Sequence, residues 1–188
     1  MIDYRLPRMA LIAAVAALTA TAHAQTAAPP AGTASAAAHR DVSRSDRHFL
    51  ENAAAGGMAE VALGNMARER GTSDAVKQFG ERMVQDHTRA NEEVNRLAAA
   101  RGVGTPTDSD RHHRRSMDKL GKLQGAEFDR EFAKAMVDDH ERTVELFEKQ
   151  SKRGDDAELK AFATKTLPTL RDHLQAARAL QQGAKASR

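Results

Sequence analysis

Three histidines, each directly after an aspartate, stand where the inward face of a helix would normally carry a hydrophobic residue. They are His87, His140 and His173. Around the first of them, Phe79 and Met83 precede the histidine at steps of four, which is the spacing of one helical face. A buried imidazole has two ring nitrogens to satisfy. Three imidazoles that converge in a core therefore predict a binding site rather than ordinary packing.

Glu60 is a fourth candidate ligand, because it lies among small residues on the inward face of an earlier helix. At 1.5 Å per residue, Glu60, His87 and His140 each fall near the middle of their helices. His173 falls about four residues nearer the end of its helix, or ~6 Å. We hypothesise that Glu60, His87, His140 and His173 bind one transition-metal ion, for which zinc, iron, manganese and copper all suit these donors.

The same residues also permit a metal-free interpretation. A buried network of histidine and glutamate could fix the register of the helices, as a single polar residue does in a coiled coil. The aspartates before the histidines point ~100° away around each helix and are poor ligands for the same ion. We expect them to pair with arginine or lysine, or to orient the histidines from behind.

The elements that carry these residues are all predicted to be helices. Strand-like alternation is absent, whereas caps and glycines delimit long helical segments. The expected elements are a helix of about 43–70, a second of about 73–101, a short third opening at Asp108 or Ser109, a fourth of about 126–153 and a fifth that Asp155 caps and that ends near 182. Short connections favour antiparallel neighbours, so we predict an all-α, up-down-up-down four-helix bundle with a short extra helix before the third long one.

The N-terminus carries the pattern of a secretory signal peptide over residues 1–24, with a basic start, an apolar run and a small-x-small cleavage site. Residues 25–41 are rich in Ala, Pro and Thr and are predicted to be a disordered linker. The folded domain is expected at 42–182 and a disordered tail at 183–188. This organisation predicts a periplasmic or secreted protein without a stable membrane span, or an N-terminal membrane anchor if the signal is not cleaved.

Composition excludes several classes of function. The chain has no cysteine, so disulfides and thiol chemistry are excluded. The 29 basic residues are nearly balanced by 26 acidic ones, and one tyrosine with no tryptophan leaves little to stack on bases. These features disfavour nucleic-acid binding. The basic run at 111–115 is interpreted as a solvated helix start or, alternatively, as a patch for anionic groups.

Several motifs resemble one bacterial family. They are Gly56-Gly57-Met58-Ala59-Glu60, Met83-Val84-Gln85-Asp86-His87, Gly125-Ala126-Glu127-Phe128 and Thr166-Leu167-Pro168-Thr169-Leu170. Over about 46–180 the chain is similar to the exported family catalogued as domain of unknown function 4142, which resembles ferritin-like bundles. The resemblance implies a ferritin-like fold and brings no established activity.

The sequence departs from the di-iron pattern of ferritin-like enzymes. Those enzymes place a glutamate three residues before a histidine on two helices, whereas here these positions hold Val84, Val137 and Leu170. No nucleophile with a partnering base is evident either. We therefore predict a metal-binding bundle rather than an enzyme, with two alternatives: a structural or stress-linked interaction protein with a metal-free histidine network, and a metal-dependent oxidoreductase. Protein partners are not predicted.

Overall fold

The computed structural model describes residues 42–186, and their regular secondary structure is entirely helical. The five helices are α1 (Arg44–Arg70), α2 (Asp74–Ala99), α3 (Arg111–Leu120), α4 (Gly125–Arg153) and α5 (Ala157–Ala186). Among the described residues, no helix is long and apolar enough to cross a membrane. The predicted signal peptide (1–24), linker (25–41) and last two residues lie outside the described part of the chain.

Side-chain caps set the starts of α1, α2 and α3. Ser43 caps α1 and Ser73 caps α2, within the predicted positions. The prediction for α3 is wrong, because Asp110 is the cap and accepts a hydrogen bond from the backbone N–H of His113 at 2.9 Å. Asp108 instead accepts from the adjacent Ser109 N–H, so its carboxylate is engaged before the helix begins.

The last helix also differs from its predicted limits. Asp156, rather than Asp155, accepts the backbone N–H groups of Glu158 and Leu159 at the start of α5. At its other end α5 continues to Ala186, four residues beyond the predicted limit at 182. Alanine and lysine are good helix formers, which accounts for the extension.

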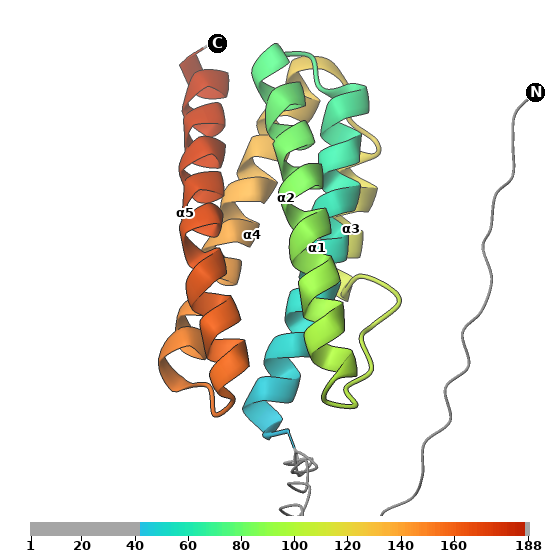
Figure 1. Ribbon diagram of the computed structural model, residues 1–188. Coiled ribbons are helices and arrows are strands. Elements are labelled where there is room, and N and C mark those ends of the chain that lie inside the picture. Colours follow the sequence, from blue (N-terminus) through green and yellow to red (C-terminus); the bar gives the residue numbers. More distant parts are fainter. Residues whose placement is uncertain (1–41, 187–188) are drawn as a thin grey trace, which may run out of the picture. The chain divides into compact units, whose positions relative to one another are not determined.

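The long helices run up, down, down and up (Figure 1), so the predicted up-down-up-down order is wrong. At one end, Arg70 of α1 donates to the carbonyls of Gly121 and Leu123, just before α4 begins. At the other end, Arg101, which follows α2, pairs with Asp156 at the start of α5. The segment 100–124, which contains α3, therefore carries the chain back along the molecule and makes α2 and α4 parallel.

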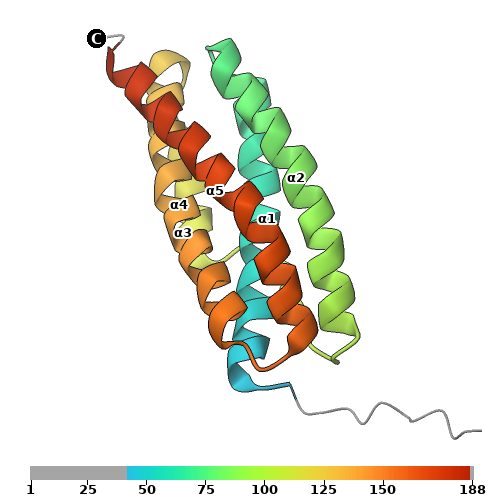
Figure 2. The same ribbon diagram turned by 60° about the vertical axis from the view of Figure 1, so that its left-hand side comes forward.

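The four long helices form two closely packed pairs (Figure 2), α1 with α2 and α4 with α5. Gly64 and Gly80 allow the first pair to approach. A Cβ at Gly80 would lie 2.6 Å from the carbonyl oxygen of Gly64, and a Cβ at Gly64 would lie 2.8 Å from that of Gly80. The two pairs meet less intimately, through α1 with α4 and α2 with α5.

Two apolar clusters fill the interior, one towards each end. The first includes Phe49, Leu97, Phe147 and Phe162, whose three phenylalanine rings pack mostly edge to face. The second is built around buried Leu63, Phe79, Met83, Phe128, Phe132 and Met136. Between these two groups along the helices lie buried Glu60, His87, Asp139, His140 and His173, so a polar layer made of these residues divides the core.

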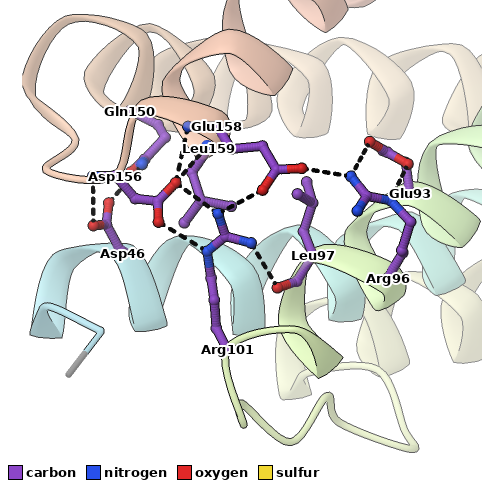
Figure 3. Close-up of polar contacts among 9 residues, drawn as sticks. All are labelled: Asp46, Glu93, Arg96, Leu97, Arg101, Gln150, Asp156, Glu158 and Leu159. Atoms are coloured by element: carbon purple, nitrogen blue, oxygen red, sulfur yellow. Dashed lines mark hydrogen bonds and ion pairs between the residues drawn. The ribbon is translucent and has the colours of Figure 1, made fainter. Parts of the chain in front are cut away.

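A polar network fastens the end of the molecule where α2 and α4 finish (Figure 3). Arg101 donates to Asp156 at 2.7 Å and to Glu158 at 2.9 Å. Asp46 of α1 accepts from Gln150 of α4 at 2.6 Å and from the backbone N–H of Asp156 at 3.0 Å. These contacts connect α1, α4 and the start of α5 with Arg101, which follows α2. All four long helices are thereby held together on one side of the polar layer.

Candidate metal centre

The three seam histidines meet in the polar layer. One nitrogen from each of His87, His140 and His173 lies within 4.8 Å of the others. All three side chains are buried, at 6% exposure for His87 and 0% for the other two. His173 therefore belongs with the other two histidines, although the sequence placed it nearer the end of its helix.

Each histidine has one buried ring nitrogen without a hydrogen-bond partner. These are Nε2 of His87, Nε2 of His140 and Nδ1 of His173. The opposite nitrogens of two rings are engaged: His140 Nδ1 donates to the carbonyl of Met136 at 2.9 Å, and His173 Nε2 donates to Asp86 at 2.8 Å. Because these two nitrogens carry the ring protons, the unpartnered nitrogens of His140 and His173 carry lone pairs. A proton on Nδ1 of His87 would likewise leave a lone pair on its Nε2.

The environment keeps these imidazoles neutral. Burial lowers the pKa of His87 well below its usual value, and the repulsion that a proton on His87 would meet from protonated His140 or His173 lowers it further. Burial also lowers the pKa of His140, to about 4. For His173, burial lowers the pKa, and the hydrogen bond that its Nε2 donates to Asp86 only partly offsets that effect. Neutral imidazole is the form that binds a metal ion.

The aspartates before the histidines behave as expected from their helical positions. Asp86 orients His173 and is itself held by Arg82 at 3.5 Å and by Arg89. Asp172 is exposed and lies 3.9 Å from Arg82. A carboxylate behind a ligating imidazole fixes its tautomer and raises its basicity, which is how protein metal sites are commonly supported.

The three nitrogens are somewhat farther apart than in a loaded site. Metal–nitrogen bonds of about 2.0–2.1 Å in a tetrahedron put nitrogens about 3.4 Å apart. From the 4.8 Å limit, the widest pair must close by up to about 1.4 Å. Each ring sits at the end of two rotatable bonds, so small rotamer adjustments suffice to bring them to an ion.

Glu60 lies beside the triad but does not share its centre. Its Oε1 is 3.8 Å from Nδ1 of His140, the nitrogen already committed to Met136. Both oxygens of Glu60 and Oδ2 of Asp139 are buried and lack a donor. A proton on Glu60 can satisfy this carboxyl pair. Burial raises the pKa of Glu60 well above its usual value, and Asp139 raises it further.

His113 is a buried, titratable residue beside the polar layer that the sequence did not predict. It comes from the basic run at 111–115, yet it is only 7% exposed, and its Nε2 donates to Asp139 at 2.9 Å. Burial opposes its charged form, but Asp139 and then Asp110 raise its pKa above the usual value. The one available signal was its place three residues after the cap Asp110, a pairing hidden by the misassigned start of α3.

A cavity of about 470 Å³ borders the triad. His87, His173 and Glu60 contribute to its wall, as do apolar side chains of the first core cluster. Its charged lining residues are Arg89 and Glu93 of α2, Glu158 and Lys165 of α5, and Asp86. Two of its lining residues, Glu93 and Glu158, also belong to the network of Figure 3.

Solved structures with similar folds come from two kinds of protein. A crystal structure of a DUF305 fragment from Deinococcus radiodurans matches with a TM-score of 0.67 at 12% identity, over 76% of this chain and 99% of that one. CopM in its Cu(II)-bound form matches with a TM-score of 0.63 at 16% identity, over 73% and 95%. Its silver-soaked form gives 0.61 at 17% identity, over 73% and 94%. At these identities the likeness concerns the fold alone.

No curated protein matches this chain. A family model does match, over residues 31–180, which includes the whole of α1 to α4, most of α5 and every residue of the triad. The chain therefore belongs to the family described as Domain of unknown function (DUF4142).

Proposed function

We propose that this protein binds one transition-metal ion through His87, His140 and His173. The observation that carries the proposal is a set of three buried histidines that each offer one ring nitrogen within 4.8 Å of the others, and that each have a buried ring nitrogen without a partner. A buried polar atom without a partner costs roughly 1–3 kcal/mol. One ion would satisfy all three at once, and the lone pairs are already directed by the hydrogen bonds on the opposite ring nitrogens.

The donor set favours borderline metals. Neutral imidazoles suit zinc, copper, iron and nickel, while manganese prefers sites richer in oxygen. Met83 and Met136 are buried in the second core cluster and serve it as packing residues. In our proposal Glu60 stays outside the coordination sphere, because protonation and its contact with Asp139 remove the charge that would attract a cation.

We further propose that the fold is a ferritin-like four-helix bundle and that the protein is exported. The up-down-down-up order with one long crossover is the connectivity of ferritin-like bundles. Export rests on the signal-peptide pattern of residues 1–24. The copper-bound and silver-bound forms of CopM support a metal-handling role for this kind of fold. The role proposed here is binding rather than catalysis.

One alternative follows from the same geometry. Two of the three imidazoles already have a hydrogen bond on one nitrogen, and a modest movement of His87 could supply a third, from its Nε2 to a neighbouring ring. The polar layer would then act only as a metal-free register device between two apolar clusters.

Titration of the purified, chelator-stripped protein with Zn²⁺ or Cu²⁺ tests the proposal. We expect one tightly bound equivalent and a higher midpoint of thermal unfolding, since an ion that binds only the native state stabilises it by about 2.7 kcal/mol at a hundred times its Kd. His87→Ala should lose both effects. His112→Ala removes an exposed histidine and is the matched control. An absent equivalent, or one that survives in His87→Ala, would leave the metal-free network as the better account.

A further inference from the structure

The cavity beside the triad has the features of a ligand-binding pocket. Its volume of about 470 Å³ lies within the usual range of roughly 300–1,000 Å³ for small-molecule sites. Its walls are mainly apolar, from Ala53, Val94, Phe147, Phe162 and Leu170. Space of this size between packed helices is not needed to admit a bare ion.

The pocket and the triad share walls. His87 and His173 border the cavity from α2 and α5. Ala90 and Thr143, one turn beyond His87 and His140 on their helices, border it as well. One turn beyond His87 and His140, the inward faces of α2 and α4 therefore line the pocket rather than packed core.

Three protein ligands leave a coordination position free. A tetrahedral ion bound by three histidines has one position for an outside ligand, as in catalytic rather than structural zinc sites. Glu60 does not fill this position in the described geometry, since its Oε1 lies 3.8 Å from Nδ1 of His140 and the group of donors within 4.8 Å of one another holds only the three histidines. Glu60 also borders the cavity, and its two oxygens are buried and lack a donor.

We propose that the pocket admits a small organic molecule that coordinates the bound metal. The molecule carries one neutral nitrogen donor for the ion and an N–H group that donates a hydrogen bond to Glu60. Its apolar body is enclosed by the residues of the first core cluster that line the pocket. This inference rests on the proposed metal site and adds to it a ligand class and an open position.

The experiment compares two probes on protein loaded with Co²⁺, whose absorption spectrum reports its coordination. Imidazole and 4-phenylimidazole present the same donor, but only the second carries an apolar body. Burying the phenyl ring removes apolar surface from water, so 4-phenylimidazole should bind at least tenfold more tightly. The cobalt content after each titration is measured to exclude extraction of the ion.

Two variants locate the binding. Ala90→Phe fills part of the pocket and should weaken 4-phenylimidazole at least tenfold while the affinity for Co²⁺ stays unchanged. Thr88→Phe adds the same ring to the exposed side of α2 and should change neither value. If Ala90→Phe fails to fold, Thr169→Phe fills the pocket from α5. Tight Co²⁺ binding without a spectral response, or equal affinities for the two probes, would overturn the pocket proposal alone. Failure to take up Co²⁺ would overturn the metal site with it.

Discussion

Two histidine–aspartate pairs in this molecule look alike but hold their protons differently. His173 donates to Asp86 at 2.8 Å and His113 donates to Asp139 at 2.9 Å, and both rings are buried. Burial and the nearby Arg82 nevertheless lower the pKa of His173, whereas Asp139 raises the pKa of His113 with help from Asp110.

The difference lies in what surrounds each pair. His113 faces the carboxylates of Asp139 and Asp110 and lies in the N-terminal turn of α3. His173 has one carboxylate, which Arg82 and Arg89 share, and two further imidazoles on its other side. One layer of the core thus holds a triad that favours neutral imidazoles, suited to a metal ion, beside a His113–Asp139 pair that favours the protonated imidazole.

The largest contrast should appear in metal affinity. His140→Ala removes a triad nitrogen, and we expect the affinity for Zn²⁺ to fall by more than 100-fold, since structural zinc sites gain about 10–16 kcal/mol from about four ligands. His113→Ala should change that affinity by less than about threefold. Competition with a chromophoric chelator measures both values. Similar losses in the two variants would remove the distinction between the triad and His113.

Acid should expose the second contrast. In metal-free protein, unfolding frees the triad histidines to take up protons below about pH 6.5, while native His140 stays neutral down to about 4. Stability is therefore complete above pH 6.5 and falls below it, by roughly 3 kcal/mol for His140 alone. Urea unfolding from pH 8 to 4 measures this loss.

His113 should act in the opposite sense over the same range. Its raised pKa gives stability that is present at low pH and is lost as the pH rises through the native value. The free energy of unfolding of His113→Gln should therefore fall further below that of the wild type at pH 5 than at pH 8. A stability of His113→Gln that does not fall from pH 8 to 4 would refute the neutral triad, because the opposing contribution of His113 is absent from that variant.

The support from Asp86 should give a smaller effect. Asp86→Asn removes the carboxylate behind His173, and loss of such a partner typically lowers metal affinity 10–100-fold. Asp172→Asn is the matched control, because Asp172 directly precedes His173 but is exposed. The same competition assay applies. Equal affinities in these two variants would show that Asp86 does not orient a ligand.

The smallest effect is expected at Glu60. Glutamine closely resembles the protonated carboxyl, so Glu60→Gln should change metal affinity by less than about threefold and leave the triad intact. If Glu60 instead completes the coordination sphere, as the sequence suggested, the same variant should lose affinity by a factor closer to that of His140→Ala.

Helical periodicity predicted much of this arrangement. The inward steps around His87 and His140 placed both side chains in the core, and the caps Ser43 and Ser73 marked the first two helices. The direction of α4 was not predictable in this way, because the return of segment 100–124 depends on tertiary contacts such as Arg70 with the carbonyl of Leu123.

The polar layer was only partly predictable for a similar reason. Periodicity gives the face of a helix on which a residue lies, but not its neighbour across the core. Glu60 lies on the inward face of α1, at the same depth as the triad. Its neighbour across the core is nevertheless Asp139, the residue before His140. His113 was hidden because a basic run reads as solvated until α3 is placed against α4.

The central claim is that three specified nitrogens bind one ion. Diffraction from a crystal of the Zn²⁺-loaded protein, recorded on both sides of the zinc absorption edge, tests it most directly. We predict a single buried anomalous peak about 2.0–2.1 Å from Nε2 of His87, Nε2 of His140 and Nδ1 of His173. A fully loaded protein whose zinc lies only elsewhere, with the three rings unchanged, would contradict the account.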